Sequence, residues 1–437
     1  MSSFTSDLLA VLKSRGTVIV TGLLTSVITA RYLGPEGNGV VATLIVYPNL
    51  FMIVGSLGIR QSAAYYMGQK KYDESDILAS VINVWLFTSI IGVAICYILL
   101  KYFTNTKFSN TLLFLTLLPV PFALLTTYVS GLFLGKNAIK DFNTVNWVPN
   151  VVKLIAYVLV IMILPWDVYG ALIGIALGYI LLTFFVWAKL KKMIKFRWTP
   201  NWEITKKMLS LGSVYALSLM IINLNYRVDV ALLEHFAGEY QVGIYTKGVS
   251  IVEYLWEIPT VLSTIIFARS ATSNDPKAFS YKVCQLLRIC FIVISLCSVA
   301  FYFLSTFIMV TMYSETFRPS SMVQKILLPG ILLLTVFKIL NMDLAGRGKP
   351  WLSTIAMIPA LVINAVLNCL WDSKYGGNGA AWASTISYSI SAIVFLVMYS
   401  NHVKISIKEI FAYSKSDFDF IGGLVQRFKK KPNKTAA

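Results

Sequence analysis

The sequence predicts an all-α polytopic membrane protein with twelve transmembrane helices, and three observations support this fold class. Hydrophobic residues make up 57% of the 437 positions and charged residues only 13%, whereas soluble domains carry about 25% charged residues. Apolar runs of roughly 20 residues, the length of a helix that crosses the hydrocarbon, recur along the whole chain. Lysine and arginine concentrate in alternate connections between these runs, as expected of a multi-pass protein.

Each apolar run of sufficient length is predicted to cross the membrane once. Prolines inside several runs, such as Pro48, Pro149 and Pro359, are compatible with this because neighbouring helices satisfy the freed carbonyls. The predicted spans are residues 14–33, 39–58, 78–100, 111–135, 144–164, 168–188, 208–233, 241–267, 284–312, 322–345, 351–371 and 379–400.

The distribution of basic residues predicts the orientation of these spans. With the N-terminus in the cytoplasm, most of the 38 lysines and arginines fall in the inner segments and few in the outer ones. This excess indicates an N-in, C-in topology. The stretch 189–207 then forms a basic cytoplasmic linker, which meets anionic membrane lipids and joins six-helix bundles at 1–188 and 208–400. Residues 401–437 form a basic cytoplasmic tail.

An internal repeat relates the two predicted bundles. The segment FAGEYQVGIY at 236–245 matches YLGPEGNGVV at 32–41, so that the turn from Gly34 to Gly39 recurs from Gly238 to Gly243. Further weak matches between the two halves of the chain occur at similar sequence separations. Because each half holds six spans, both halves run in the same direction, and we expect a pseudo-two-fold axis along the membrane normal.

Ionisable residues inside or beside the spans are the candidates for function, because such residues usually face a bundle interior or a wet cavity. They have two interpretations: they pair with one another and stabilise the bundle, or the cations line a cavity that receives an anion. Glu253 and Glu257 are four residues apart and are expected to share a helix face. The candidate substrate-binding cations are Arg31, Lys153, Arg227, Lys247 and Lys338, and the candidate ion-coupling acids are Asp229, Glu253, Glu257 and Asp343.

Several function classes find no support in the sequence. No Walker A loop, GxSxG or HExxH motif is present, and no catalytic residue is predicted. The five cysteines form no CxxC pair and only two histidines occur, so neither a metal site nor a cofactor is expected. The net charge of +18 is assigned to the membrane surface, and no nucleic-acid partner is predicted.

Four segments resemble a known family. ARYLGPEGNGV, FAGEYQVGIY, LAGRGKP and KYGGNGAAWAS are similar to the Wzx-type polysaccharide biosynthesis flippases of the multidrug/oligosaccharidyl-lipid/polysaccharide exporter superfamily. The resemblance implies two bundles around a central cationic cavity in the bacterial inner membrane. It implies translocation of an undecaprenyl-pyrophosphate-linked oligosaccharide to the outer leaflet, for O-antigen or capsule synthesis. A polysaccharide polymerase and a chain-length regulator are the candidate protein partners.

The resemblance ranks some of the candidate residues. Arg31 in ARYLGP comes first, followed by Arg227 with Asp229, although the order Arg227-Val228-Asp229 departs from the expected acidic-then-basic order. Lys153 and Lys338 depend on their depth in a span and on no motif. The main alternative function is a multidrug antiporter of the same superfamily. A polysaccharide polymerase or ligase is a second alternative, but it would be expected to show a large extramembrane loop.

Overall fold

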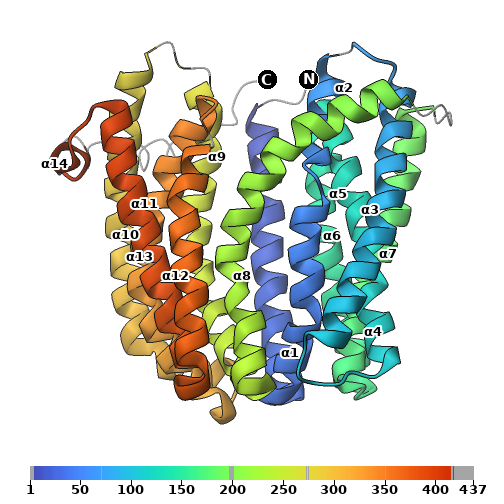
Figure 1. Ribbon diagram of the computed structural model, residues 1–437, viewed down its shortest axis with the longest axis vertical. Helices are drawn as coiled ribbons and strands as arrows, with labels where there is room; N and C mark the ends of the chain where they lie inside the picture. The colour runs from blue at the N-terminus through green and yellow to red at the C-terminus, as the bar shows by residue number, and fades with distance from the viewer. Residues whose placement is uncertain are drawn as a thin grey trace, which may run out of the picture.

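The computed structural model describes residues 4–69, 71–136, 138–195, 201–271, 273, 275–349, 351–414 and 417. Within these residues the protein is helical and contains no β-strand (Figure 1). The helices are α1 (Phe4–Gly55), α2 (Ile59–Gln69), α3 (Glu74–Tyr102), α4 (Asn110–Leu117), α5 (Pro119–Gly135), α6 (Ile139–Tyr157), α7 (Asp167–Met193), α8 (Trp202–Glu253), α9 (Glu257–Ala271), α10 (Pro276–Met312), α11 (Ser320–Gly346), α12 (Trp351–Tyr375), α13 (Gly377–Val403) and α14 (Ile407–Ile410). A π-helical turn, Val158–Ile163, follows α6, and 3₁₀ turns occupy Tyr254–Trp256 and Glu315–Phe317.

Side-chain caps define where several helices begin. Asp73 accepts a hydrogen bond from the backbone N–H of Ser75 at the start of α3, and Asn201 accepts two from the first turn of α8. Asp275 caps α10, whose first residue is Pro276. These residues satisfy N–H groups that have no partner within the helix, and proline at the first position needs none.

The two longest helices contain the predicted repeated turn. In α1, Gly34 has φ 65° and ψ −175°, and in α8, Gly238 has φ 78° and ψ 174°. The same non-helical conformation thus occurs at both positions, and its positive φ favours glycine. Both helices turn back at the lower end of Figure 1. Asn38 bridges the arms of α1 by donating to the carbonyls of Thr29 (2.8 Å) and Gly34 (2.6 Å).

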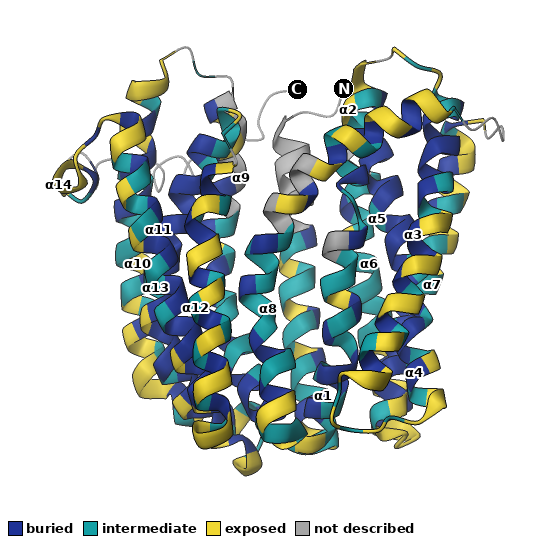
Figure 2. Ribbon diagram, viewed as in Figure 1, coloured by how far each residue is buried: buried dark blue, intermediate teal, exposed yellow. Residues whose placement is uncertain are grey.

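The outer surface is that of a multi-pass membrane protein. Nine helices in the described part of the chain are long and apolar enough to cross a membrane. Large apolar side chains such as Ile90 and Phe303 are exposed. Figure 2 shows exposed residues recurring along the outer helices α3, α7 and α10, where lipid accommodates apolar side chains. The count of nine does not establish the predicted twelve spans, because α1 is counted once and α8 is not counted. The pseudo-two-fold axis also stays a prediction.

The helix α2 and the turn between α8 and α9 are two features that were not predicted from the sequence. The short helix α2 follows α1 directly and has mean hydropathy too low for a span. Glu253 ends α8 and Glu257 begins α9, with a 3₁₀ turn between them. The backbone keeps right-handed helical dihedral angles through this turn, and both carboxylates interact electrostatically with Lys338, so the expectation of one shared face stays a prediction. Parts of the predicted linker (196–200) and most of the tail (418–437) lie outside the described residues.

The apolar core is distributed unevenly. One continuous cluster runs through α8 to α13, with contributions from α1. The buried apolar residues of α1 to α7 instead form three separate clusters. The space between these three clusters is where the main cavity lies.

Candidate functional site

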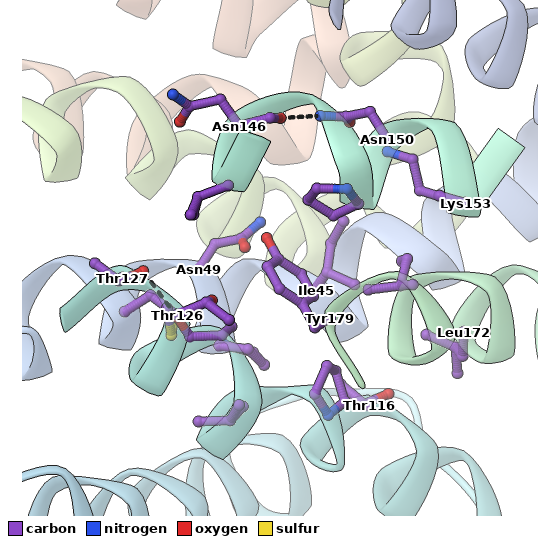
Figure 3. Close-up of a pocket in the computed structure, with 18 of the residues that line it drawn as sticks. Ile45, Asn49, Thr116, Thr126, Thr127, Asn146, Asn150, Lys153, Leu172 and Tyr179 are labelled. Carbon is purple, nitrogen blue, oxygen red and sulfur yellow. Dashed lines mark hydrogen bonds between the residues drawn. The ribbon is translucent and has the colours of Figure 1, made fainter. Parts of the chain in front are cut away.

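The main cavity has a volume of about 380 Å³ and is enclosed by α1, α2, α4, α5, α6 and α7 (Figure 3). Its lining mixes apolar side chains with many uncharged polar groups and two cations, but it includes no aspartate or glutamate. The polar and cationic lining residues are Asn49, Arg60, Thr116, Thr126, Thr127, Ser130, Asn146, Asn150, Lys153 and Tyr179.

Lys153 projects from α6 and lines two cavities. Besides the main cavity it belongs to a second one of about 220 Å³, which lies among α1, α6, α7 and α8. The ammonium group of Lys153 has no hydrogen bond, ion pair or aromatic contact to any residue that the structure describes. A lysine held in this way inside an apolar bundle is available to an anionic ligand.

Lys247 of α8 lines the second cavity as well. Its side chain is buried, and Nζ donates to the Ser26 carbonyl (3.0 Å) and to Thr29 Oγ1 (2.8 Å). The ammonium also lies 5.3 Å from the centre of the Tyr313 ring. All of these partners are neutral, and the lining of the second cavity contains no acid. Lys153 and Lys247 also interact electrostatically with each other. This cavity therefore holds two lysines and no lining acid.

The other predicted cations have partners elsewhere. Arg227 pairs with Glu253 at 3.3 Å. Lys338 lies 4.3 Å from the centre of the Trp256 ring, a cation–π geometry. Glu257 pairs with Arg15 of α1 at 3.5 Å. These groups come from α1, α8, α9 and α11 and do not line the two cavities described above, so their predicted roles stay untested.

Arg31 is exposed and reaches the C-terminal end of α10. Its Nε donates to the Met312 carbonyl at 3.0 Å, and Nη2 donates to the Thr311 carbonyl. A cation at this position satisfies carbonyls that have no partner within the helix and complements the helix dipole. Arg31 lines neither cavity. A substrate contact by Arg31 stays a prediction.

The other two acidic candidates, Asp343 and Asp229, are buried in two separate networks in the second half. Asp343 is fully buried and accepts hydrogen bonds from Arg347, Ser270, Ser280 and Tyr399. Every oxygen of this carboxylate has a partner, which is typical of a structural group.

Asp229 is buried and lies near a row of polar side chains on α12 that was not predicted from the sequence. It accepts hydrogen bonds from Tyr245 and Ser384 and interacts electrostatically with Asp372 of α12. Asp372 is fully buried, and neither of its oxygens has a partner among the described residues. The spacing of Asn364, Asn368 and Asp372, four residues apart on one helix face, was a signal in the sequence. Asp372 was overlooked because it directly follows the predicted span 351–371.

Comparison with known proteins agrees with this architecture. Residues 9–268 match the family described as polysaccharide biosynthesis protein. An uncharacterised membrane protein of Methanocaldococcus jannaschii is 22% identical over 389 residues, which cover 85% of this chain and 91% of that protein.

Solved structures share the fold. A lipid II flippase, MurJ, in its inward closed conformation superposes with a TM-score of 0.77 at 18% identity, covering 98% of this chain and 94% of that one. An inward-facing multidrug resistance transporter of the MATE family and the MOP superfamily gives 0.67 at 14% identity, covering 89% and 94%. A MOP superfamily transporter from Pyrococcus furiosus gives 0.65 at 14% identity, covering 91% and 94%. The chain is therefore a member of the polysaccharide biosynthesis protein family with the fold of the MOP superfamily transporters.

Proposed function

We propose that this protein is a flippase for an undecaprenyl-pyrophosphate-linked oligosaccharide, which it moves from the cytoplasmic to the outer leaflet of the bacterial inner membrane by alternating access. The observation that carries the proposal is the pair Lys153 and Lys247 in one cavity without a lining acid. The family match to polysaccharide biosynthesis supports the same substrate class.

The electrostatics of the cavity favour a multiply charged anion. At an effective dielectric constant of 20, one unit charge 4 Å from another contributes about 4 kcal/mol. A pyrophosphate between the two ammonium groups gains such a term from each of them, and it supplies the hydrogen-bond acceptors that Lys153 lacks in the described structure. An organic cation would meet repulsion from both lysines. The polarity of the cavity therefore favours the flippase over the multidrug antiporter.

The arrangement of the helices suggests how the lipid-linked oligosaccharide crosses the membrane. We propose that α1 crosses the membrane twice, with a turn at Gly34, and that α8 crosses once before its turn at Gly238 and a second time together with α9, which gives twelve spans in bundles at 1–188 and 208–400. The turns lie at the lower end of Figure 1, opposite α2, and the N-in topology assigns that end to the outside. The two turns pack closely, Gly39 against the backbone of Glu239 and Gly243 against that of Pro35, and we propose that this contact closes the outer end in this state. Transport requires the two bundles to separate there.

Asp229 and Asp372 are the proposed coupling site. Two carboxylates that interact within one buried network cannot both be charged at low cost. A proton or a bound monovalent cation would relieve that repulsion, and its exchange would bias the equilibrium between the inward and outward states. Asp343 is less suited to this role because Arg347 already neutralises it.

Single substitutions of the cavity lysines test the function. Lys153→Gln and Lys247→Gln each remove one charged contact to the pyrophosphate, which corresponds to a loss of about tenfold to a hundredfold in affinity. We expect transport of a labelled undecaprenyl-pyrophosphate glycan into proteoliposomes, and surface polysaccharide in cells, to fall accordingly. The protein level in the membrane should stay unchanged.

A matched lysine serves as the control. Lys374 is exposed near the end of α12, and Lys374→Gln should leave transport intact. Wild-type transport in both cavity variants would refute the proposal. Changed drug tolerance with intact surface glycan in a deletion strain would favour the antiporter instead.

A further inference from the structure

The uncharged wall of the main cavity holds polar groups for which the flippase proposal gives no role. Asn49 comes from α1, Asn146 from α6 and Tyr179 from α7. As viewed in Figure 3, Asn49 and Tyr179 lie between the asparagines of α6 and Thr126 and Thr127 of α5. Four helices, α1, α5, α6 and α7, therefore contribute hydrogen-bonding groups to one small space.

The hydrogen bonds of this wall leave many groups free. The hydroxyls of Thr126 and Thr127 donate to the carbonyl of Ala123 in their own helix (3.0 and 2.8 Å), which leaves their lone pairs as acceptors. The side chains of Asn49, Asn146 and Tyr179 have no hydrogen-bond partner anywhere in the described ranges. Each amide offers two donors and an acceptor. Asn49 and Asn146 are exposed and Tyr179 is half-buried, so all three side chains are accessible to a ligand that enters the cavity.

The chemistry of the wall matches one part of a lipid-linked oligosaccharide. A sugar ring carries several hydroxyls that both donate and accept, and its C–H face packs against an aromatic ring such as that of Tyr179. The volume of about 380 Å³ lies at the lower end of the range for small-molecule sites, about 300–1,000 Å³. The cavity therefore suits a small headgroup portion rather than a whole oligosaccharide.

The position of Lys153 indicates which sugar of the lipid-linked oligosaccharide would reach the main cavity. Lys153 lines both cavities, so a pyrophosphate bound between Lys153 and Lys247 in the second cavity lies beside the main cavity. The sugar attached directly to the pyrophosphate is the one that reaches this wall. We propose that Asn49, Asn146 and Tyr179 form a recognition site for that first sugar. This inference rests on the proposed flippase function.

Binding of two lipids to the purified full-length protein in nanodiscs separates sugar recognition from phosphate recognition. One probe is bare undecaprenyl pyrophosphate. The other is the same lipid carrying one sugar, tested as glucose, galactose, N-acetylglucosamine and N-acetylgalactosamine. We expect at least one glycosylated lipid to bind about tenfold more tightly than the bare lipid. Asn49→Ala, Asn146→Ala and Tyr179→Phe should remove most of that difference and leave the affinity for the bare lipid unchanged.

Two further variants complete the experiment. Lys153→Gln should weaken binding of both lipids, and Asn401→Ala, which changes an exposed asparagine of α13, should weaken neither. Retained binding of the bare lipid shows that each cavity variant is folded. The inference is overturned if no sugar increases affinity, or if the three cavity variants weaken both lipids equally. If neither lipid binds to the wild type, the flippase function fails and the sugar site fails with it.

Discussion

The helices before and after the basic linker use their polar residues in opposite ways. In α1 to α7, the apolar core is split into three clusters around a cavity that contains an unpaired lysine and unpaired amides. In α8 to α13, one continuous core surrounds Asp229 and Asp343, which are hydrogen-bonded within the protein, and Asp372, which has no partner among the described residues. The same turn motif therefore introduces two halves that have diverged, one toward an open binding space and the other toward internal polar networks.

This difference indicates which ionisable residues within the spans are candidates for function. Lys153 and Asp343 are both ionisable residues in predicted spans, yet Asp343 has Arg347 and three hydroxyls as partners while Lys153 has none among the described residues. Depth in a span does not distinguish the two cases. The presence of a partner does, because an unpaired charge is retained only at a cost in stability.

The largest expected effect comes from breaking the second-half network. Arg347→Ala leaves the fully buried Asp343 carboxylate without its cation, which costs about 3–5 kcal/mol in the free energy of unfolding. Thermal unfolding of the purified protein measures this loss. Arg318→Ala is the control, because its ion pair with Glu315 is exposed to solvent and no measurable change is expected. If Arg347→Ala and Arg318→Ala unfold at the same temperature, the second half does not depend on this network and the comparison fails.

The sequence predicted the helices better than it predicted the site. Apolar length and the alternation of basic loops identify spans because both follow directly from the bilayer. The short helix α2 was not predicted because its eleven residues are too few and too polar to meet the rule for a membrane span. Glycines 34 and 238 could be predicted as a repeated turn because their surrounding motif recurs.

The candidate site was only partly visible in the sequence. Lys153 and Lys247 stood out as charges within apolar runs. Asn49 and Tyr179 did not, because an amide or a phenol is common in a span, and these two become a site only when α1 and α7 assemble. The contact of Arg31 with the carbonyls of α10 joins residues about 280 positions apart, and no local pattern predicts it.

A smaller effect is expected where the two halves are alike. A Cβ added at Gly39 would lie 1.7 Å from the Glu239 carbonyl oxygen, and one added at Gly243 would lie 1.8 Å from that of Pro35. Gly39→Ala and Gly243→Ala should each separate the two turns and cost about 1–3 kcal/mol, the usual range for overpacking. Thermal unfolding should show similar losses for both.

Gly16→Ala is the control for these turn glycines. Nothing lies within 4 Å of a Cβ at this helical position, so alanine should raise stability slightly through its better helix propensity. A loss at only one of the two turn glycines would show that the halves have diverged at the turns as well as in the cavity.

The smallest expected effect on stability concerns Arg31 and its counterpart in the repeat, His235. His235 stands at the equivalent position, but its contact is made by its backbone carbonyl, which accepts a hydrogen bond from Asn105. Arg31 contacts α10 through its side chain. Arg31→Gln should therefore lower the free energy of unfolding by about 0.3–1 kcal/mol, the usual value of a cation at a helix C-terminus, and His235→Gln should not. Transport by Arg31→Gln should stay near the wild-type rate. If transport is abolished while the unfolding temperature is unchanged, the guanidinium acts on the substrate, as the resemblance of ARYLGP implies, and the outer end takes part in recognition together with the cavity.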